Sequence, residues 1–214
     1  MKNKFLLLLL VWGLAFKVHA HNGLRIDIIE DVSWTPVNVS ICPLHLFSSV
    51  HTDVYGVYLS PGVVGIAKNV YGISAGTLLM LFEGNNYGIT ASAVSMLEEN
   101  NGLSLGGINI CTNNGLSLGA ANLLTENYGI SAGAINLLEH NDGLSIGAVN
   151  LVSSEDSTGA SIGVVNIVDN DIFQFGLYNQ TDSGLQIGLL NYNSKAMIPW
   201  LPLFNYSSCG KSKK

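Results

Sequence analysis

The sequence predicts an all-β fold, a β-solenoid of about ten coils with about 14 residues in each coil. Three observations predict it. A short glycine-rich motif recurs through most of the chain, and each clear copy carries an asparagine at a fixed position. Apolar and polar residues alternate inside the copies, which is the period of a β-strand. The segments between copies are of one type, which favours identical coils stacked on one another.

The composition places the chain among apolar globular proteins with few charges. Of its 214 residues 48% are hydrophobic, which is too many for a wholly disordered chain and enough for a core. Only 11% are charged, against roughly 25% in ordinary soluble domains. The 15 acidic and 9 basic residues give a net charge of −6, which argues against a nucleic-acid partner.

Residues 1–20 have the pattern of a secretory signal peptide. Lys2 and Lys4 precede an apolar run over residues 5–16, and Val18-His19-Ala20 is similar to a small-x-small cleavage site. The run is too short to cross about 30 Å of hydrocarbon as a helix. We therefore expect export, a mature chain that starts at His21, and no transmembrane helix after the signal peptide.

Residues 21–53 are expected to form strands that cap the first coil. Val37, Val39 and Ile41 alternate with polar residues, as in a strand. An open end of a coil stack would pair with other chains, so both ends of a solenoid need a cover.

Residues 54–193 form the predicted repeat domain. Residues 102–106 have the sequence Gly-Leu-Ser-Leu-Gly, which recurs at 115–119, and related motifs start at residues 129, 143 and 159. The second glycine of successive copies is 12 to 16 residues from the next, and an asparagine follows three residues after it. These asparagines are Asn109, Asn122, Asn136, Asn150, Asn166, Asn179 and Asn191.

In a solenoid these seven asparagines would stack. A side-chain amide has two donors and an acceptor oxygen, so stacked amides can bond to one another and to the backbone. We therefore interpret them as a structural ladder, with a ligand-binding row as the alternative.

An antiparallel up-and-down β-barrel or meander is the alternative fold. Its loops lie at two different ends, so it favours a repeat of double length. The turns here, such as Asn113-Asn114 and Asn127-Tyr128, belong to one class, which favours the solenoid.

Residues 194–206 are expected to cap the other end, because Pro199 and Pro202 cannot continue a ladder of hydrogen bonds. Residues 207–214 form a predicted mobile tail. After export, Cys42 and Cys209 in the two flanks are candidates for a disulfide. Cys111 stands where other copies have leucine and is interpreted as a small buried side chain.

The segment Gly-Leu-Gln-Ile-Gly-Leu-Leu-Asn-Tyr at residues 184–192 resembles the Gly-Leu-Gln-Ile-Gly-Leu-x-Asn repeat of a bacterial exported "surface repeat" family. Residues 35–41 and 53–56 are similar to the opening of that family, and residues 198–205 to its closing segment. The resemblance implies export and a surface location, and it supplies no catalytic residues. This chain more often has serine than glutamine at the position that we expect to point outward.

The chain offers no pattern of catalytic, metal-binding or cofactor-binding residues. Between Lys68 and Lys195 it has eleven acidic residues and no basic one, and nearly all of the acids lie in predicted turns. We interpret them as a solvated edge, with Ca²⁺ binding as the alternative. No histidine or cysteine has metal-ligand spacing, and no His–Asp pair is indicated. We expect no enzyme activity and no cofactor.

Tyrosines stand before the first glycine of several copies, at Tyr55, Tyr71, Tyr87 and Tyr128. They are expected to line one edge of the coils, either as packing or as a face on which a glycan or partner stacks.

Together these patterns predict an exported bacterial surface repeat protein with a structural or interaction role and an unknown surface or protein partner. Its expected location is the cell surface, the outer membrane or the extracellular space, and membrane association stays open. An outer-membrane β-barrel protein is the alternative.

Overall fold

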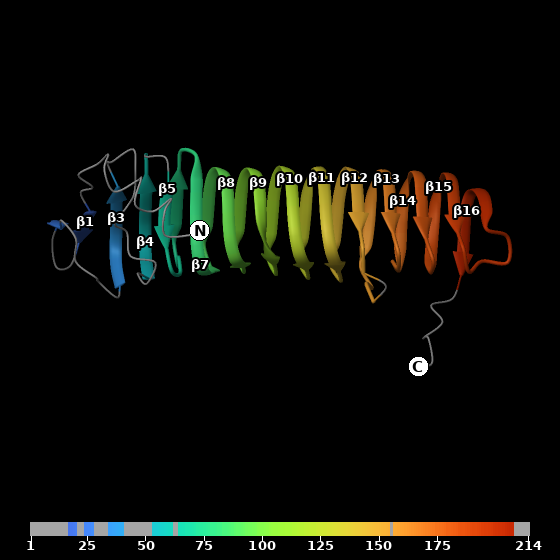
Figure 1. Cartoon of the computed structure of the whole chain (residues 1–214), viewed down its shortest axis with the longest axis horizontal. Helices are drawn as coiled ribbons and strands as arrows, with labels where there is room; N and C mark the ends of the chain where they lie inside the picture. Colours follow the sequence, from blue (N-terminus) through green and yellow to red (C-terminus); the bar gives the residue numbers. More distant parts are fainter. Residues whose placement is uncertain are drawn as a thin grey trace, which may run out of the picture. The chain divides into compact units, whose positions relative to one another are not determined.

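The chain is an all-β protein whose strands stack as the coils of a β-solenoid, as predicted (Figure 1). The computed structural model describes residues 17–20, 24–27, 34–40, 53–61, 64–154 and 156–207, with side chains from residue 53 onward. These residues contain no helix. Successive coils pair in parallel, so the antiparallel barrel or meander is wrong.

The contacts divide the chain into an N-terminal unit, residues 1–110, and a C-terminal unit, residues 111–214, with β9 (Leu103–Asn113) at the division. The N-terminal unit contains β1 (Lys17–Ala20), β2 (Leu24–Asp27), β3 (Trp34–Ser40), β4 (Asp53–Ser60), β5 (Val64–Ala67), β6 (Ile73–Gly76), β7 (Leu79–Asn86) and β8 (Ile89–Asn100). The C-terminal unit contains β10 (Leu116–Asn127), β11 (Ile130–Asn141), β12 (Leu144–Val152), β13 (Ala160–Val168), β14 (Phe173–Thr181), β15 (Gly184–Asn193) and β16 (Trp200–Ser207).

In the N-terminal unit two short strands form each early coil. β4 pairs with β6 and β6 with β8, while β5 pairs with β7 and β7 with β8, all in parallel. Before them, β3 pairs in parallel with β4, and β1 pairs antiparallel with both β2 and β3. Because β1 lies within the predicted signal peptide, cleavage after Ala20 would remove the strand partner of β2 and one partner of β3.

In the C-terminal unit β10 to β15 pair in parallel with the sequence repeats in register. Gly119 pairs with Gly133, which pairs with Gly147, and Asn122 pairs with Asn136 in the same way. The repeat length of the sequence is therefore the length of one coil. Figure 1 shows these strands side by side.

Each coil of the C-terminal unit has two limbs that turn back on each other at the second glycine. In β11 the first limb is residues 130–133, the corner is Ala134, and the second limb starts at Ile135. The Ser131 hydroxyl of the first limb donates to Asn136 Oδ1 of the second limb at 2.9 Å, so the limbs share an interior. A Cβ at Gly147 would lie 2.7 Å from both Asn136 Nδ2 and the Gly133 oxygen, which explains the glycine at this turn.

The C-terminal segment covers the last coil. It does so by adding one more strand to the ladder, and not by ending it as the prolines had suggested. β16 reverses direction and pairs antiparallel with β15, for example Ile187 with Phe204. The register shifts between Gly188 and Asn191, and Pro202 lies in this irregular part, where its missing N–H breaks no ladder bond. Residues 208–214, Cys42 and Cys209 lie outside the described residues, as does most of the expected signal peptide.

Candidate functional site

The seven asparagines of the predicted ladder are all buried. In the C-terminal unit each side-chain amide from Asn122 to Asn179 donates to the amide oxygen of the equivalent asparagine in the next coil. The Nδ2–Oδ1 distances between successive asparagines are 2.8 Å for Asn122–Asn136, 2.7 Å for Asn136–Asn150, 2.7 Å for Asn150–Asn166, 2.8 Å for Asn166–Asn179 and 2.8 Å for Asn179–Asn191. Asn109, in the N-terminal unit, accepts from the Ser104 hydroxyl at 2.8 Å.

The hydrogen-bonding capacity of these amides is used within the protein. Asn136 Nδ2 donates to Asn150 Oδ1 and, at 2.9 Å, to the Ile146 oxygen. Its Oδ1 accepts from Asn122 Nδ2 and from the Ser131 hydroxyl. Two donors and two acceptor sites are thus satisfied, so the Asn136 amide bonds to both neighbouring coils and has no group left for a ligand.

A second asparagine column lies at the other end of the coils that contain Asn86 to Asn141, and the sequence pattern had not been interpreted in this way. Asn113 donates to Asn127 at 2.7 Å and Asn127 to Asn141 at 2.8 Å, and in the N-terminal unit Asn86 donates to Asn100 at 2.8 Å. All five side chains are buried. We had assigned these residues to exposed turns, although their regular spacing of 13 or 14 residues was visible in the sequence.

Asp171 is a buried acid near this second column. It is 2% exposed, and neither carboxylate oxygen has a partner at hydrogen-bonding geometry. Burial raises the pKa of Asp171 to about 7, although interactions with Ser161, Gln174 and Asn141 oppose the rise. This residue is therefore an exception to the expectation that the acids lie in solvated turns.

The outward side chains are the apolar ones, which corrects our expectation for serine and glutamine. Ser117, Ser131, Ser145 and Ser161 are buried, as are Gln174 and Gln186 at the same position of later coils. The serine hydroxyl can reach the asparagine side chain of the facing limb, so the polar residue of the alternating pattern lies in the interior. The leucines and isoleucines on either side of it point away from the coil.

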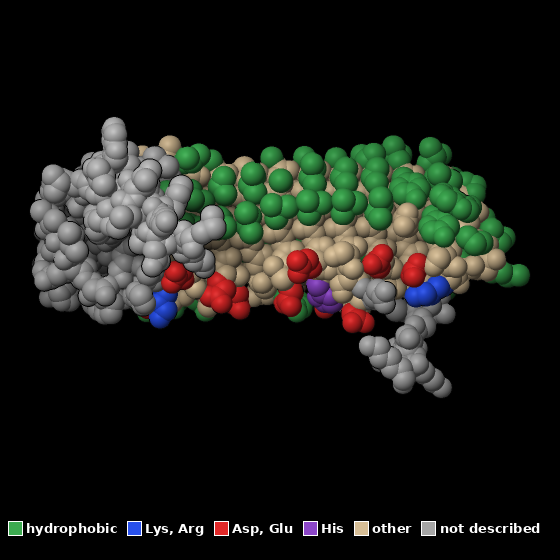
Figure 2. All heavy atoms as spheres, viewed as in Figure 1, with side chains coloured by type: hydrophobic (Ala, Val, Ile, Leu, Met, Phe, Trp, Pro, Cys, Tyr) green, Lys and Arg blue, Asp and Glu red, His purple; other side chains and the backbone are tan. Residues whose placement is uncertain are grey.

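The outward residues of β10 to β15 form what we call the apolar band. It covers three sides of each coil: the first limb, the corner and the second limb. Its most exposed members are Ile130, Ile135, Leu137, Ile146, Leu151, Val164, Phe175, Leu177, Leu185, Ile187, Leu189 and Leu190. Figure 2 shows hydrophobic side chains gathered over this unit and acidic ones along the opposite margin.

The fourth side of these coils is an acidic turn edge. Its described acids are Glu126, Glu139, Asp142, Asp156, Asp169 and Asp182. Lys195 forms an ion pair with Asp182, with Nζ 3.3 Å from Oδ2. Glu155 lies outside the described residues.

The turn edge also contains a His–Asp pair that the sequence did not indicate. His140 Nε2 lies 3.0 Å from Asp142 Oδ2, and His140 Nδ1 lies 3.2 Å from the Ser154 hydroxyl. Asp142 also accepts hydrogen bonds from the Thr158 N–H and hydroxyl. Burial acts to raise the pKa of Asp142, but the bonds from Thr158 and the interaction with His140 outweigh it, so this pKa lies below its usual value. The His140 and Asp142 side chains are 23% and 31% exposed, so water competes for them. We interpret these hydrogen bonds as structural contacts that hold the longest turn of the unit, after Val152, against the preceding coil.

Three of the predicted edge tyrosines stack in the N-terminal unit. The ring centroids of Tyr55 and Tyr71 are 4.5 Å apart, those of Tyr71 and Tyr87 are 4.8 Å apart, and the rings are nearly parallel. Both faces of Tyr71 are thus covered by its neighbours, whereas a sugar would need an open ring face. The stack therefore supports packing of the edge, and Tyr128 belongs to the C-terminal unit.

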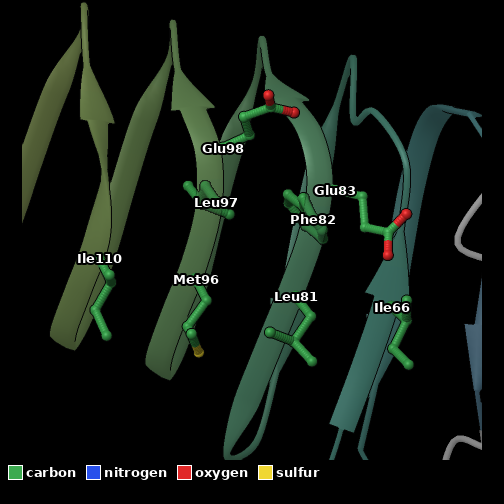
Figure 3. A pocket seen from close by; sticks show the side chains of 8 residues that line it. All are labelled: Ile66, Leu81, Phe82, Glu83, Met96, Leu97, Glu98 and Ile110. Atoms are coloured by element: carbon green, nitrogen blue, oxygen red, sulfur yellow. The ribbon is translucent and has the colours of Figure 1, made fainter. Parts of the chain in front are cut away.

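A depression of about 510 Å³ lies on the N-terminal unit (Figure 3). Ile66, Leu81, Met96 and Ile110 follow one another across neighbouring strands, and Glu83 and Glu98 lie to one side of this row, further along their strands. It shows that apolar side chains face outward in this unit too.

The described residues contain no group of three or more histidine, cysteine or acidic side chains placed to hold a metal ion. Cys111 is buried, as expected, and burial raises the pKa of its thiol to about 11, although a bond with Ser117 opposes the rise. Among the described residues we find no helix of the length and hydropathy required to span a membrane. No family model, curated protein or solved structure matches this chain.

Proposed function

We propose that this chain is an exported bacterial surface protein with a structural or interaction role, without catalytic activity. One observation carries the proposal: the polar side chains of the coils bond to one another inside, while the outer surface is apolar on three sides and acidic on the fourth. A surface of this kind suits contact with a partner over a large area.

Two features of the sequence support export. Residues 1–20 have the charge, apolar run and small residues of a signal peptide. The repeats resemble those of an exported surface family, although that resemblance rests on residues of this chain alone.

Export can be tested by expressing the full chain in a Gram-negative bacterium. We expect mass spectrometry to find a mature chain that starts at His21, and we expect added protease to degrade it on intact cells. A control with Leu7→Arg and Leu9→Arg disrupts the apolar run and should stay uncleaved inside the cell. A wild-type chain that keeps residues 1–20 and fractionates with cytosolic markers would contradict the proposal.

A further inference from the structure

We propose that the apolar band of the C-terminal unit inserts edgewise into one leaflet of a membrane of uncharged or zwitterionic lipids, with the acidic turn edge left in water. This inference rests on the proposed interaction role and names its partner, a lipid surface.

The distribution of charge in the sequence supports insertion. The six stretches at residues 116–124, 130–138, 144–152, 160–168, 173–181 and 185–193 contain no Asp, Glu, Lys or Arg. Each stretch runs along the first limb, around the corner and along most of the second limb. No charge would therefore enter the lipid with them, while the acids of the unit lie in the turns or, like Asp171, in the interior near them.

The depth of the band fits one leaflet. From Ile130 to the corner at Ala134 the chain advances four residues, which is about 13 Å in a strand. From the corner to the buried Leu138 the second limb covers the same length. Half of a hydrocarbon core of about 30 Å is about 15 Å. The band can thus fill one leaflet without carrying the turn edge below the headgroups.

Most polar groups of these coils are satisfied within the protein; the described side-chain atoms of the C-terminal unit that are buried without a hydrogen-bond partner are Ser161 Oγ, Gln186 Oε1, Asn193 Nδ2 and the two Asp171 carboxylate oxygens. A polar group in hydrocarbon must be satisfied within the protein. The backbones of β11 to β14 have a parallel partner on each side. The asparagine amides between the limbs are bonded as well.

The corner distinguishes lipid from a second copy of the chain. Val164, Leu177 and Leu189 follow one another along the corner and are 49%, 58% and 68% exposed. Two copies that pack face to face would cover one limb of each coil and leave the corner and the other limb in water. Lipid covers all three sides at once. The absence of Lys and Arg between Lys68 and Lys195 favours uncharged or zwitterionic lipids, because basic residues are what attract proteins to anionic membranes.

The test is flotation of the mature chain, residues 21–214, with phosphatidylcholine vesicles. We expect it to float with the vesicles and to bind more weakly when phosphatidylglycerol is added, with salt restoring part of the binding. Leu177→Ser combined with Leu189→Ser should lower the partition coefficient at least tenfold, because the most exposed apolar side chains at the corner are lost. A control with Glu139→Ser and Asp169→Ser on the turn edge should bind phosphatidylcholine as the wild type does. Circular dichroism checks that each variant is folded.

A second measurement reports depth. In a Trp34→Phe, Trp200→Phe background, the fluorescence of Leu189→Trp should be quenched by lipids brominated deep in the acyl chain, and that of Thr125→Trp should not. A chain that stays unbound, a corner variant that binds as well as the wild type, or a face-to-face dimer that binds no vesicle would each overturn the inference. A chain that binds vesicles but is not exported would contradict the proposed export alone, and an exported chain that binds none would contradict insertion alone.

Discussion

Asp171→Asn should stabilise the protein, and the gain should depend on pH. The Asp171 carboxyl is 2% exposed, and burial raises its pKa from 3.8 to about 7. In the unfolded chain the group ionises above about pH 4, whereas in the folded chain it stays protonated until about pH 7. Folding is therefore weakened as pH rises between these values, and the loss is complete above pH 7. About three pKa units correspond to about 4 kcal/mol, which is the largest gain that asparagine can produce at pH 8.

The assay is urea unfolding of the wild type and of Asp171→Asn at pH 4 and pH 8. The two proteins should differ by less than about 1 kcal/mol at pH 4, where Asp171 is protonated in the folded chain and about half protonated in the unfolded chain, and by several kcal/mol at pH 8. Asp156→Asn, at the exposed turn edge, is the control and should change stability by less than about 0.5 kcal/mol. An equal difference between wild type and Asp171→Asn at both pH values would refute the explanation by ionisation.

Three further results are expected. Asn136→Leu should cost about 1–3 kcal/mol in a denaturant titration, because it removes one hydrogen-bond partner from each of Asn122, Asn150 and Ser131 inside the coil; a cost near zero would mean that the ladder adds no stability. Raising NaCl should stabilise the fold modestly by screening the acidic turn edge, and Ca²⁺ should raise the melting temperature no more than Mg²⁺ at equal ionic strength; a rise of several degrees with Ca²⁺ alone would indicate a calcium site. The Cys111 thiol should react with a thiol reagent only after unfolding, since it is buried and its pKa is about 11; fast labelling of native Cys42→Ser, Cys209→Ser protein would contradict this.

The spacing of the asparagines was enough to predict the coils. In a stack of parallel coils each residue lies above its equivalent in the next coil, so a repeat in the sequence is a repeat in space. Asn122, Asn136 and Asn150 could therefore be assigned to one column before their contacts were known. A buried amide needs partners, and the same residue in the next coil provides them.

The direction of the side chains was not predictable in this way. Period-two alternation separates Ser131 from Ile130 and Ala132, but it does not say which set points inward. We expected the polar set to face water. The structure reverses this, because the Ser131 hydroxyl meets the Asn136 amide across the coil and the apolar residues then point outward.

The remaining features depend on stacking that no local pattern reveals. His140 meets Ser154 because the two are fourteen positions apart, on neighbouring coils, and Asp171 is buried while other turn acids are exposed. From the sequence alone came the fold class, the coil length and the asparagine column, since these follow from periodicity. Only the tertiary structure decided which side of the strand is buried, because that depends on what the facing limb offers as a partner across the interior.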